Sequence, residues 1–304
     1  MALTPAVSTG SHPVRGALLV VAAVLLFACM DTTTKILTAD YPVPVVMAVR
    51  YVVHCLLMVV LLTPTQGRDL VRTQRTGLVL VRAFCLAAAS LFMGLALQRM
   101  PVAEATAIVF LAPLLVLVVA GQFMREHVGK VGWAAAAAGF AGVLMIARPG
   151  GGLDPAGVAY AMCAASVIAA YQLLSRVLAT TERTVALLFY TALVGSILFG
   201  ISLPWFWGGH APTPLQVLLF LSMGVLGGAG HFLFTAAHRY APASMLAPMM
   251  YLQLVWAALL GWLVFGQMSP LTSLVGMGVI AASGAVVALK SHLSRRALAA
   301  AAQG

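Results

Sequence analysis

Long apolar blocks dominate the chain, and short polar stretches separate them. Ten blocks of roughly 17–25 residues can be distinguished, which is the length an α-helix needs to cross the hydrocarbon core of a bilayer. The pattern therefore predicts an all-α integral membrane protein with ten transmembrane helices. The blocks lie near residues 16–38, 43–63, 77–98, 102–123, 130–147, 156–178, 184–204, 214–238, 242–265 and 270–290.

The composition agrees with a membrane environment. Of the 304 residues, 62% are apolar and 8% are charged, which is too few charges to cover the surface of a soluble domain. A net charge of +10 would suggest nucleic-acid binding in a soluble protein. Here the basic residues fall in short loops between the apolar blocks, where membrane topology explains them. We expect a lipid bilayer around the chain and no nucleic-acid partner.

The basic residues predict the orientation. With the N-terminus in the cytoplasm and ten spans, Arg99 and Arg148 are the only basic residues near the outer span ends. Twelve others fall on the cytoplasmic side, which is the bias that positions loops in bacterial membranes. We therefore expect a multi-pass protein of the cytoplasmic (inner) membrane with both termini in the cytoplasm. The twelve are Arg15, Arg68, Arg72, Arg75, Arg125, Lys130, Arg176, Arg183, Arg239, Lys290, Arg295 and Arg296.

No processing, metal or cofactor motif stands out. The run Gly16–Met30 resembles a signal peptide, but no cleavage site followed by a polar domain is present, so we interpret it as the first span. All four cysteines lie within predicted spans and form no Cys-x-x-Cys motif, which is typical of helix packing. We expect no metal site and no cofactor.

The second half of the chain repeats the first. Gly16–Lys35 matches Gly157–Arg176 in its first glycine and its last cation at a separation of 141 residues, and Ala96–Glu104 resembles Ala236–Ser244 at a separation of 140. Each half then holds five spans, and an odd number of spans inverts the second copy relative to the first. Inverted repeats around a shared central cavity are typical of secondary transporters. The predicted divisions are a flexible segment 1–13, repeats 14–150 and 151–292, and a cytoplasmic tail 293–304.

The first half contains a characteristic set of residues that includes Lys35, Arg50, Arg82, Pro101 and Pro113. In this pattern the chain resembles the EamA-type members of the drug/metabolite transporter superfamily, over about residues 15–290. In the second half, Gln253 and Gln267 stand where that family usually has Pro and Glu. The resemblance implies ten helices in two inverted five-helix repeats, and export of small metabolites. Within the family the chain looks most like bacterial amino-acid exporters, including the aromatic type. The matching residues are Lys35, Arg50, Arg82, Ala96-Leu97, Pro101, Ala103-Glu104-Ala105, Pro113, Glu126, Gly142 and Arg148-Pro149.

Charged residues inside predicted spans indicate the transport pathway. An ionisable group at membrane depth costs at least ~2.5–3.5 kcal/mol, so its presence needs a reason. Asp31 and Arg50 lie at similar depth in the first two spans, and Lys35 is one turn from Asp31. The three either form a structural clamp or contact the substrate. Asp31 is not part of the family pattern, so it is the better candidate for a substrate or proton contact.

Other titratable groups allow two interpretations each. His54 and His231 lie deep enough to relay protons, or they are neutral side chains that bond backbone groups. Arg82 and Glu104 lie near span ends, where we expect both to reach an interface and serve a structural role.

Aromatic, amide and methionine side chains on the first, sixth and ninth spans supply the rest of the predicted pathway. Tyr171 and Gln172 are the repeat partners of Met30 and Asp31, so an amide is expected to face the Asp31 carboxylate. The alternative is ordinary helix packing. The candidates besides Asp31, Lys35, Arg50, His54 and His231 are Met30, Tyr171, Gln172, Met250, Tyr251, Gln253 and Trp256.

Pro113 and Pro248 interrupt the fourth and ninth spans and are predicted hinges, because each removes a backbone hydrogen bond. The glycines Gly224, Gly227, Gly228 and Gly230 give the eighth span a smooth face for contact within or between subunits. The chain is therefore expected to be a monomer or a homodimer.

Together these features predict a secondary transporter that exports small amphipathic metabolites, amino acids first, by alternating access. Protons remain an open coupling ion. The alternative is an exporter of organic cations or drugs, with Asp31 as the counter-charge. An intramembrane enzyme or a channel fits less well, because the sequence has no catalytic motif, nucleotide-binding motif or filter loop. The prediction for enzymatic activity is negative.

Overall fold

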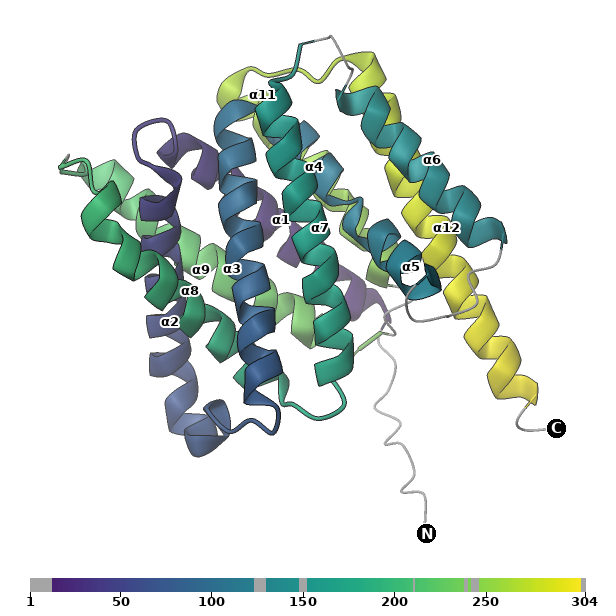
Figure 1. Cartoon of the computed structure of the whole chain (residues 1–304), viewed down its shortest axis with the longest axis horizontal. Coiled ribbons are helices and arrows are strands. Elements are labelled where there is room, and N and C mark those ends of the chain that lie inside the picture. Colours follow the sequence, from purple (N-terminus) through teal and green to yellow (C-terminus); the bar gives the residue numbers. More distant parts are fainter. Residues whose placement is uncertain are drawn as a thin grey trace.

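The computed structural model describes residues 13–122, 130–147, 152–209, 211–237, 240–241 and 246–301, and within them it is helical, with no strand (Figure 1). The α-helices are α1 (Pro13–Leu37), α2 (Val43–Gln66), α3 (Thr76–Arg99), α4 (Val102–Val109), α5 (Ala112–Gln122), α6 (Lys130–Ala147), α7 (Pro155–Leu178), α8 (Thr184–Phe206), α9 (Pro214–Ala237), α11 (Leu252–Phe265) and α12 (Leu271–Ala301). Two 3₁₀ segments, η1 (Gly67–Leu70) and η2 (Ala247–Tyr251), complete the described structure.

Eight helical segments in the described residues are long and apolar enough to cross a membrane. They correspond to the first eight predicted spans, with α4 and α5 together forming the fourth. The last two predicted spans appear as shorter apolar helices, Met249–Phe265 and Leu271–Val287. The apolar blocks of the sequence thus locate the helices, and the last two apolar helices are shorter than the other eight.

The fourth predicted span is broken in the middle. Helix α4 ends at Val109, and α5 begins three residues later, at Ala112. The amide of Leu111 bonds the carbonyl of Ile108 at 3.0 Å, a three-residue step that tightens the chain. Pro113 follows directly and has no N–H to continue the helical ladder. Pro248 lies in η2, so both prolines mark a change of helix geometry.

The C-terminal segment is helical over most of the predicted tail. Helix α12 continues without interruption through the predicted boundary at residue 293 and ends at Ala301. Its last turns are rich in Ala, Leu and Arg, which have the strongest helix propensities, so the local sequence supports helix beyond the apolar block. Of the predicted flexible segment 1–13, only residue 13 lies among the described residues.

Helices that are distant in the sequence pack against each other. Helix α3 lies along α7 in the centre of the molecule, and α6 lies along α12 at one edge (Figure 1). Contacts of α1 with α9 and of α2 with α8 also join the first half to the second. Because every one of these pairs links the two halves, neither half is a separate domain in this structure.

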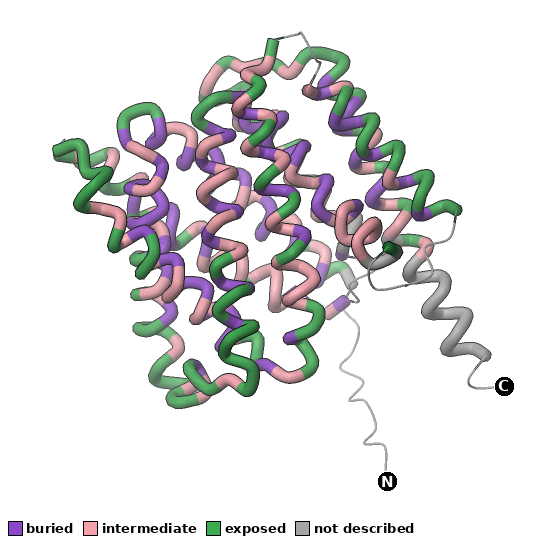
Figure 2. The backbone as a smooth tube through the Cα atoms, in the orientation of Figure 1, coloured by how far each residue is buried: buried purple, intermediate pink, exposed green. Residues whose placement is uncertain are grey.

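Residues facing the interior of the bundle are buried, and the outer surface is apolar, as a bilayer requires. The inward faces of the helices are buried, while exposed positions lie on their outer faces (Figure 2). Many exposed residues are large and apolar: Val60, Ile201, Leu218 and Phe232 are each more than 60% exposed. An exposed apolar surface of this extent is stable in lipid and not in water.

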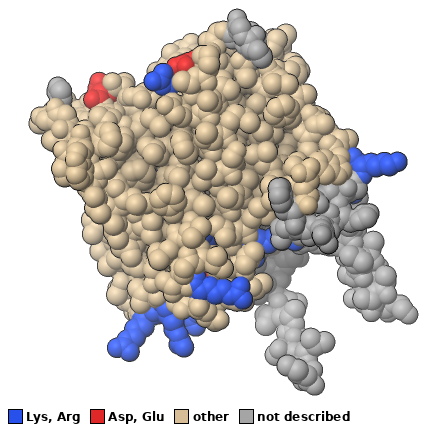
Figure 3. Space-filling view, in the orientation of Figure 1, with Lys and Arg blue, Asp and Glu red and all other residues tan. Residues whose placement is uncertain are grey.

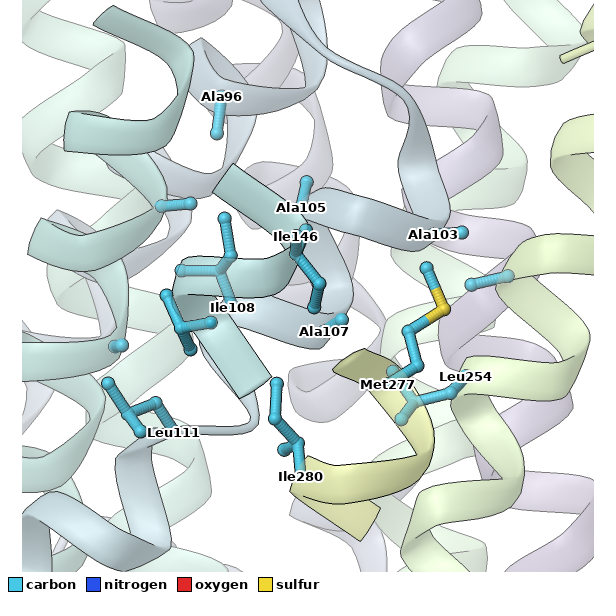
Figure 4. Packing of buried hydrophobic residues seen from close by; sticks show 14 of the residues in the cluster. Ala96, Ala103, Ala105, Ala107, Ile108, Leu111, Ile146, Leu254, Met277 and Ile280 are labelled. Atoms are coloured by element: carbon cyan, nitrogen blue, oxygen red, sulfur yellow. The ribbon is translucent and has the colours of Figure 1, made fainter. Parts of the chain in front are cut away.

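A tightly packed cluster fills the bundle between α3, α4, α6, α7, α11 and α12. The alanines of α4 let the larger side chains Ile146 and Ile280 approach from α6 and α12 (Figure 4). All of Val102–Ile108 is buried, so α4 is enclosed on every side. A helix that is apolar all round is expected in such an interior position.

Charged side chains separate to the two ends of the molecule. In Figure 3, Lys and Arg gather mainly along the lower edge, whereas Asp and Glu lie near the upper edge, where a basic side chain lies beside an acidic one; a broad band of the surface between the two edges is largely uncharged. Exposed Arg68, Arg72 and Arg75 lie beyond the end of α2, whereas Asp40 lies before its start. Three of the basic residues used to predict orientation, Arg125, Arg148 and Arg239, lie outside the described residues.

Candidate functional site

A cavity of about 600 Å³ lies at the centre of the bundle, lined by α1, α2, α3, α4, α5, α7, α9, η2, α11 and α12. Most of its wall is apolar or aromatic, and the rings come from Phe27, Phe110, Phe234 and Tyr251. The polar groups in the wall are few, as is usual for a small-molecule site. They are Asp31, Arg50, Ser90, Thr106, Gln172, His231 and Gln253.

Equivalent positions of the two halves line this cavity together. Seven pairs of wall residues are separated by 141 positions, the spacing that relates Gly16 to Gly157 in the sequence. Both halves of the chain therefore contribute equivalent positions to one cavity. The pairs are Phe27 and Ile168, Asp31 and Gln172, Ser90 and His231, Met93 and Phe234, Val109 and Met250, Phe110 and Tyr251, and Ala112 and Gln253.

The structure brings together most of the pathway residues predicted from the sequence. The wall contains Met30, Asp31, Arg50, Gln172, His231, Met250, Tyr251 and Gln253, together with Pro113. Lys35, His54, Tyr171 and Trp256 lie outside the wall, and each has another environment.

Asp31 bonds an amide from the other half of the chain. Gln253 Nε2 donates to Asp31 Oδ2 at 3.3 Å, whereas Gln172, the amide expected there, lines the cavity without a hydrogen bond to Asp31. Both Asp31 and Arg50 are described, and no nitrogen–oxygen contact of 4.0 Å or less joins them. The two side chains therefore form no direct ion pair, although both face the same cavity.

The Arg50 guanidinium is open to the cavity. Among the described residues, its one polar contact is Nη1 to the sulfur of Met47 at 3.9 Å, and it lies 5.5 Å from the ring centroid of Tyr51. Gly227 of α9 leaves the room for this side chain, because a Cβ there would lie 3.9 Å from Arg50 Nε and 3.2 Å from Met30 Sδ. The predicted glycine face of α9 thus packs within the subunit, against α1 and α2.

Lys35 serves as a cap. Its ammonium group donates to the carbonyls of Leu97 and Met100 at 2.7 and 2.8 Å, and it lies 5.6 Å from the ring centroid of Phe265. Leu97 and Met100 end helix α3, where backbone carbonyls lack helical partners and attract cations. The position of Lys35 is structural.

Tyr171 belongs to a buried network around Arg82. The guanidinium donates to Tyr171 Oη at 2.6 Å, to Ser175 Oγ at 2.7 Å and to Thr191 Oγ1 at 3.1 Å, as well as to the carbonyl of Leu187 at 3.1 Å. Arg82 is only 5% exposed, so the expectation that it reaches an interface is wrong. It ties α3 to α7 and α8 instead.

The two histidines lie one behind the other. His231 is in the cavity wall, and the ring of His54 lies parallel to it, with centroids 6.3 Å apart and planes at 8°. His231 also contacts the ring of Phe27 at 5.0 Å. His54 therefore lies in a second layer behind the wall.

Trp256 packs against the cluster formed by α1 and α9.

Glu104 is buried in α4 and does not reach an interface, contrary to expectation. It is 1% exposed, and its Oε2 has no hydrogen-bond partner in the part of the chain that the structure describes. The short, enclosed α4 explains this, because a residue near its start is still surrounded by protein.

Several wall residues were missed in the sequence, notably Phe27, Ser90, Met93, Phe110 and Phe234. The repeat contains the signal that finds them, because each has a wall residue 141 positions away. Within the described residues, no group of three or more His, Cys, Asp or Glu side chains is placed to hold a metal ion.

A ring-lined cavity between two halves of an apolar helical bundle is typical of membrane transporters. Residues 14–148 and again residues 155–289 match the EamA-like transporter family, and the chain belongs to this family. Both starts and both ends of the two matches are 141 residues apart, the spacing found in the cavity wall.

Named relatives point to two kinds of solute. The riboflavin transporter of Vibrio cholerae is 26% identical over 91% of this chain and 93% of that protein. The S-adenosylmethionine uptake transporter of Rickettsia bellii is 25% identical over 70% of this chain and 73% of that protein. A riboflavin transporter of Rhizobium johnstonii is 32% identical over 56% of each chain.

A solved crystal structure shares the fold. It aligns with 92% of this chain and 98% of its own, with a TM-score of 0.65 at 21% identity.

The named relatives above are transporters, as the sequence predicted, but none of them is named as an exporter of aromatic amino acids. The predicted subgroup is therefore not supported.

Proposed function

We propose that the protein is a secondary transporter that moves a small amphipathic solute with a flat ring system through the central cavity by alternating access. The observation that carries this proposal is the matched wall: seven pairs of equivalent positions from two repeats enclose one space. A site shared by two halves changes its access when one half rocks against the other. The aromatic side chains in the wall suit a planar solute.

The two repeats have opposite orientation in this proposal. Arg183 pairs with Asp69, so the loop between α7 and α8 lies at the far end of α2, near η1. The equivalent loop between α1 and α2, which contains Asp40, lies at the start of α2. A helix of this length separates its ends by about 36 Å, so the equivalent loops lie at opposite ends of the bundle. This arrangement supports ten spans in two inverted sets of five.

The basic end of the molecule faces the cytoplasm in this proposal. The arginines of the α2–α3 loop and Arg183 share one end, and the bias of basic residues toward the cytoplasm orients it. Both termini then lie in the cytoplasm, and the membrane is the inner membrane of a bacterium.

Uptake of a heteroaromatic metabolite, driven by a gradient, is the transport activity we propose. Two relatives are named for riboflavin and one for uptake of S-adenosylmethionine, and both compounds combine a flat ring with polar groups. The exporter role expected from the sequence finds no support in these names. Asp31 in the wall favours a solute with a positive charge, which keeps S-adenosylmethionine and the organic cations in consideration.

Transport in proteoliposomes tests the proposal. Liposomes containing the protein are preloaded with unlabelled riboflavin or S-adenosylmethionine, and entry of the same labelled compound is followed by counterflow. We expect at least one compound to enter several-fold faster than into protein-free liposomes.

A matched pair of substitutions on α12 locates the path. Val287 lines the cavity, whereas its neighbour Val286 is 45% exposed on the outer face. Val287→Trp should reduce counterflow to the protein-free level, and Val286→Trp should leave it near the wild-type rate. Equal rates for the two variants, or no entry of either compound into wild-type liposomes, would contradict the proposal.

A further inference from the structure

Two opposite charges share the cavity without pairing with each other. Asp31 of α1 is 8% exposed, and its carboxylate has the single contact from Gln253 at 3.3 Å. Arg50 of α2 has a 3.9 Å contact to a thioether sulfur and lies 5.5 Å from the ring centroid of Tyr51. Neither charge therefore forms an ion pair within 4.0 Å among the residues that the structure describes.

The other charges within the spans are already engaged or lie elsewhere. Lys35 is used by the carbonyls that end α3, and Arg82 by the side chains and carbonyl of α7 and α8. Glu104 is enclosed in α4 and is not part of the cavity wall. Among the described residues, Asp31 and Arg50 are therefore the two charged side chains of the cavity wall.

An unpaired charge in a low-dielectric site is unfavourable, and it gains most from a partner that it can contact directly. A solute with one positive and one negative group satisfies both side chains at once. A cation alone leaves Arg50 without a counter-charge, and an uncharged flavin leaves both side chains unpaired. Charge complementarity thus selects a zwitterion.

We propose that the cavity recognises a zwitterionic α-amino-acid group attached to a ring, with Asp31 binding the ammonium and Arg50 binding the carboxylate. This inference rests on the proposed transport function and names its substrate class. The Arg50 guanidinium offers two parallel donors to a carboxylate, and this geometry makes such contacts strong.

Gln253 and the aromatic wall complete the site. The amide of Gln253 holds Asp31 from the second half of the chain, so the ammonium would be bound where the two halves meet. The rings of Phe110 and Tyr251, whose centroids lie 5.0 Å apart, offer a surface for the ring of the solute. Binding at such a junction depends on both halves.

A pair of matched ligands tests the inference directly. S-adenosylhomocysteine and methylthioadenosine share the adenine ring, the ribose and a thioether, but only the first carries an α-ammonium and an α-carboxylate. Affinities are measured on the full-length protein in lipid nanodiscs by isothermal titration calorimetry. We expect the zwitterion to bind at least tenfold more tightly, and Asp31→Asn and Arg50→Gln each to remove most of that difference.

Controls separate recognition from folding. Asp40→Asn and Arg68→Gln make the same changes at exposed residues outside the cavity wall, and they should keep the wild-type preference. Thermal unfolding shows whether each variant folds. Arg50→Lys keeps the positive charge and should recover part of the preference.

The outcomes distinguish this inference from the transport function itself. Equal affinity for the two ligands, or a preference that survives both Asp31→Asn and Arg50→Gln, would overturn the inference while counterflow of a ring solute still supported transport. Binding of riboflavin alone would also overturn it and leave the transport function intact. Absence of both binding and counterflow would overturn the two together.

Discussion

The ring of Phe110 lies against the ring of Tyr251, with centroids 5.0 Å apart and planes tilted by 40°. The two residues are 141 positions apart and occupy the two interruptions of regular helix, between α4 and α5 and at the end of η2. The interrupted helices of the two halves thus meet at the cavity. A change in backbone conformation at one interruption would therefore act on the other through the contact between the two rings.

Gly284 of α12 leaves the room that Tyr251 occupies in this contact, because a Cβ at position 284 would overlap the tyrosine hydroxyl. We expect Gly284→Ala to displace the ring and to lower the free energy of unfolding by about 1–3 kcal/mol, the usual cost of overpacking. The counterflow rate should fall several-fold. Gly278→Ala on the same helix meets nothing within 4 Å and should leave both quantities near wild type. Equal effects of the two substitutions would show that the contact has no role.

Gly227 makes room for two wall residues, Met30 and Arg50. In Gly227→Ala the new methyl group would press on Met30 Sδ and narrow the space beside the guanidinium. We expect ligand affinity to fall several-fold while the thermal midpoint changes little, since the loss of a helical glycine contributes roughly 0.5–1 kcal/mol in compensation. Gly200→Ala, with no neighbour within 4 Å, is the control for helix propensity. Calorimetry that shows unchanged affinity for Gly227→Ala would contradict the assigned geometry.

Arg82 is expected to stabilise the packing of α3 against α7 and α8. A lysine keeps the charge but cannot reproduce four directed hydrogen bonds, so Arg82→Lys should cost about 2–3 kcal/mol, the size of one or two hydrogen bonds to a charged group. Thermal unfolding in detergent measures this loss. A double-mutant cycle with Tyr171→Phe should show coupling, because the two side chains are 2.6 Å apart. Additive effects would mean that this hydrogen bond contributes nothing to stability.

Asp154 lies before α7, outside the spans, and bonds both Arg99 Nη1 at 2.9 Å and the amide of Ala156 at 2.8 Å. The Arg99 hydrogen bond holds the pKa of this carboxyl below its usual value, and the Ala156 amide adds to the effect. Its stabilising contribution is therefore complete above the unfolded-state pKa of about 3.9 and is lost as pH falls through the lower native value.

Asp154→Asn keeps the helix cap but removes the charge. We expect the variant to have a slightly lower thermal midpoint than wild type at pH 7, and the difference to shrink in acid and in high salt, since the pair is exposed. A difference that grew on acidification would contradict this assignment.

The sequence predicted the helices well because apolar length is a local property. The break of the fourth span was foreseen from Pro113, since a missing N–H acts on its own helix. The partner of Asp31 was not foreseen. Gln253 is 222 residues away, and which side chain meets another across a bundle depends on helix rotation and tilt, which no single helix encodes.

Burial of the charged groups was also hard to predict. Arg82 and Glu104 were expected at an interface from their distance to a span end, but α4 is short and enclosed, and α3 is covered by α7 and α8. The repeat spacing supplies the missing information for the cavity wall, because it pairs positions such as Ser90 with His231 independently of their chemistry.

The orientation of the two repeats is the central claim, and cysteine labelling tests it most directly. Ala39 and Thr180 are exposed, equivalent positions 141 residues apart, in the α1–α2 and α7–α8 loops. In a background without Cys29, Cys55, Cys85 and Cys163, each is replaced by cysteine and treated with a membrane-impermeant maleimide, in intact cells and in inverted vesicles. The inverted arrangement predicts that Ala39→Cys reacts only in intact cells and Thr180→Cys only in inverted vesicles. Reaction of both from the same side would contradict it.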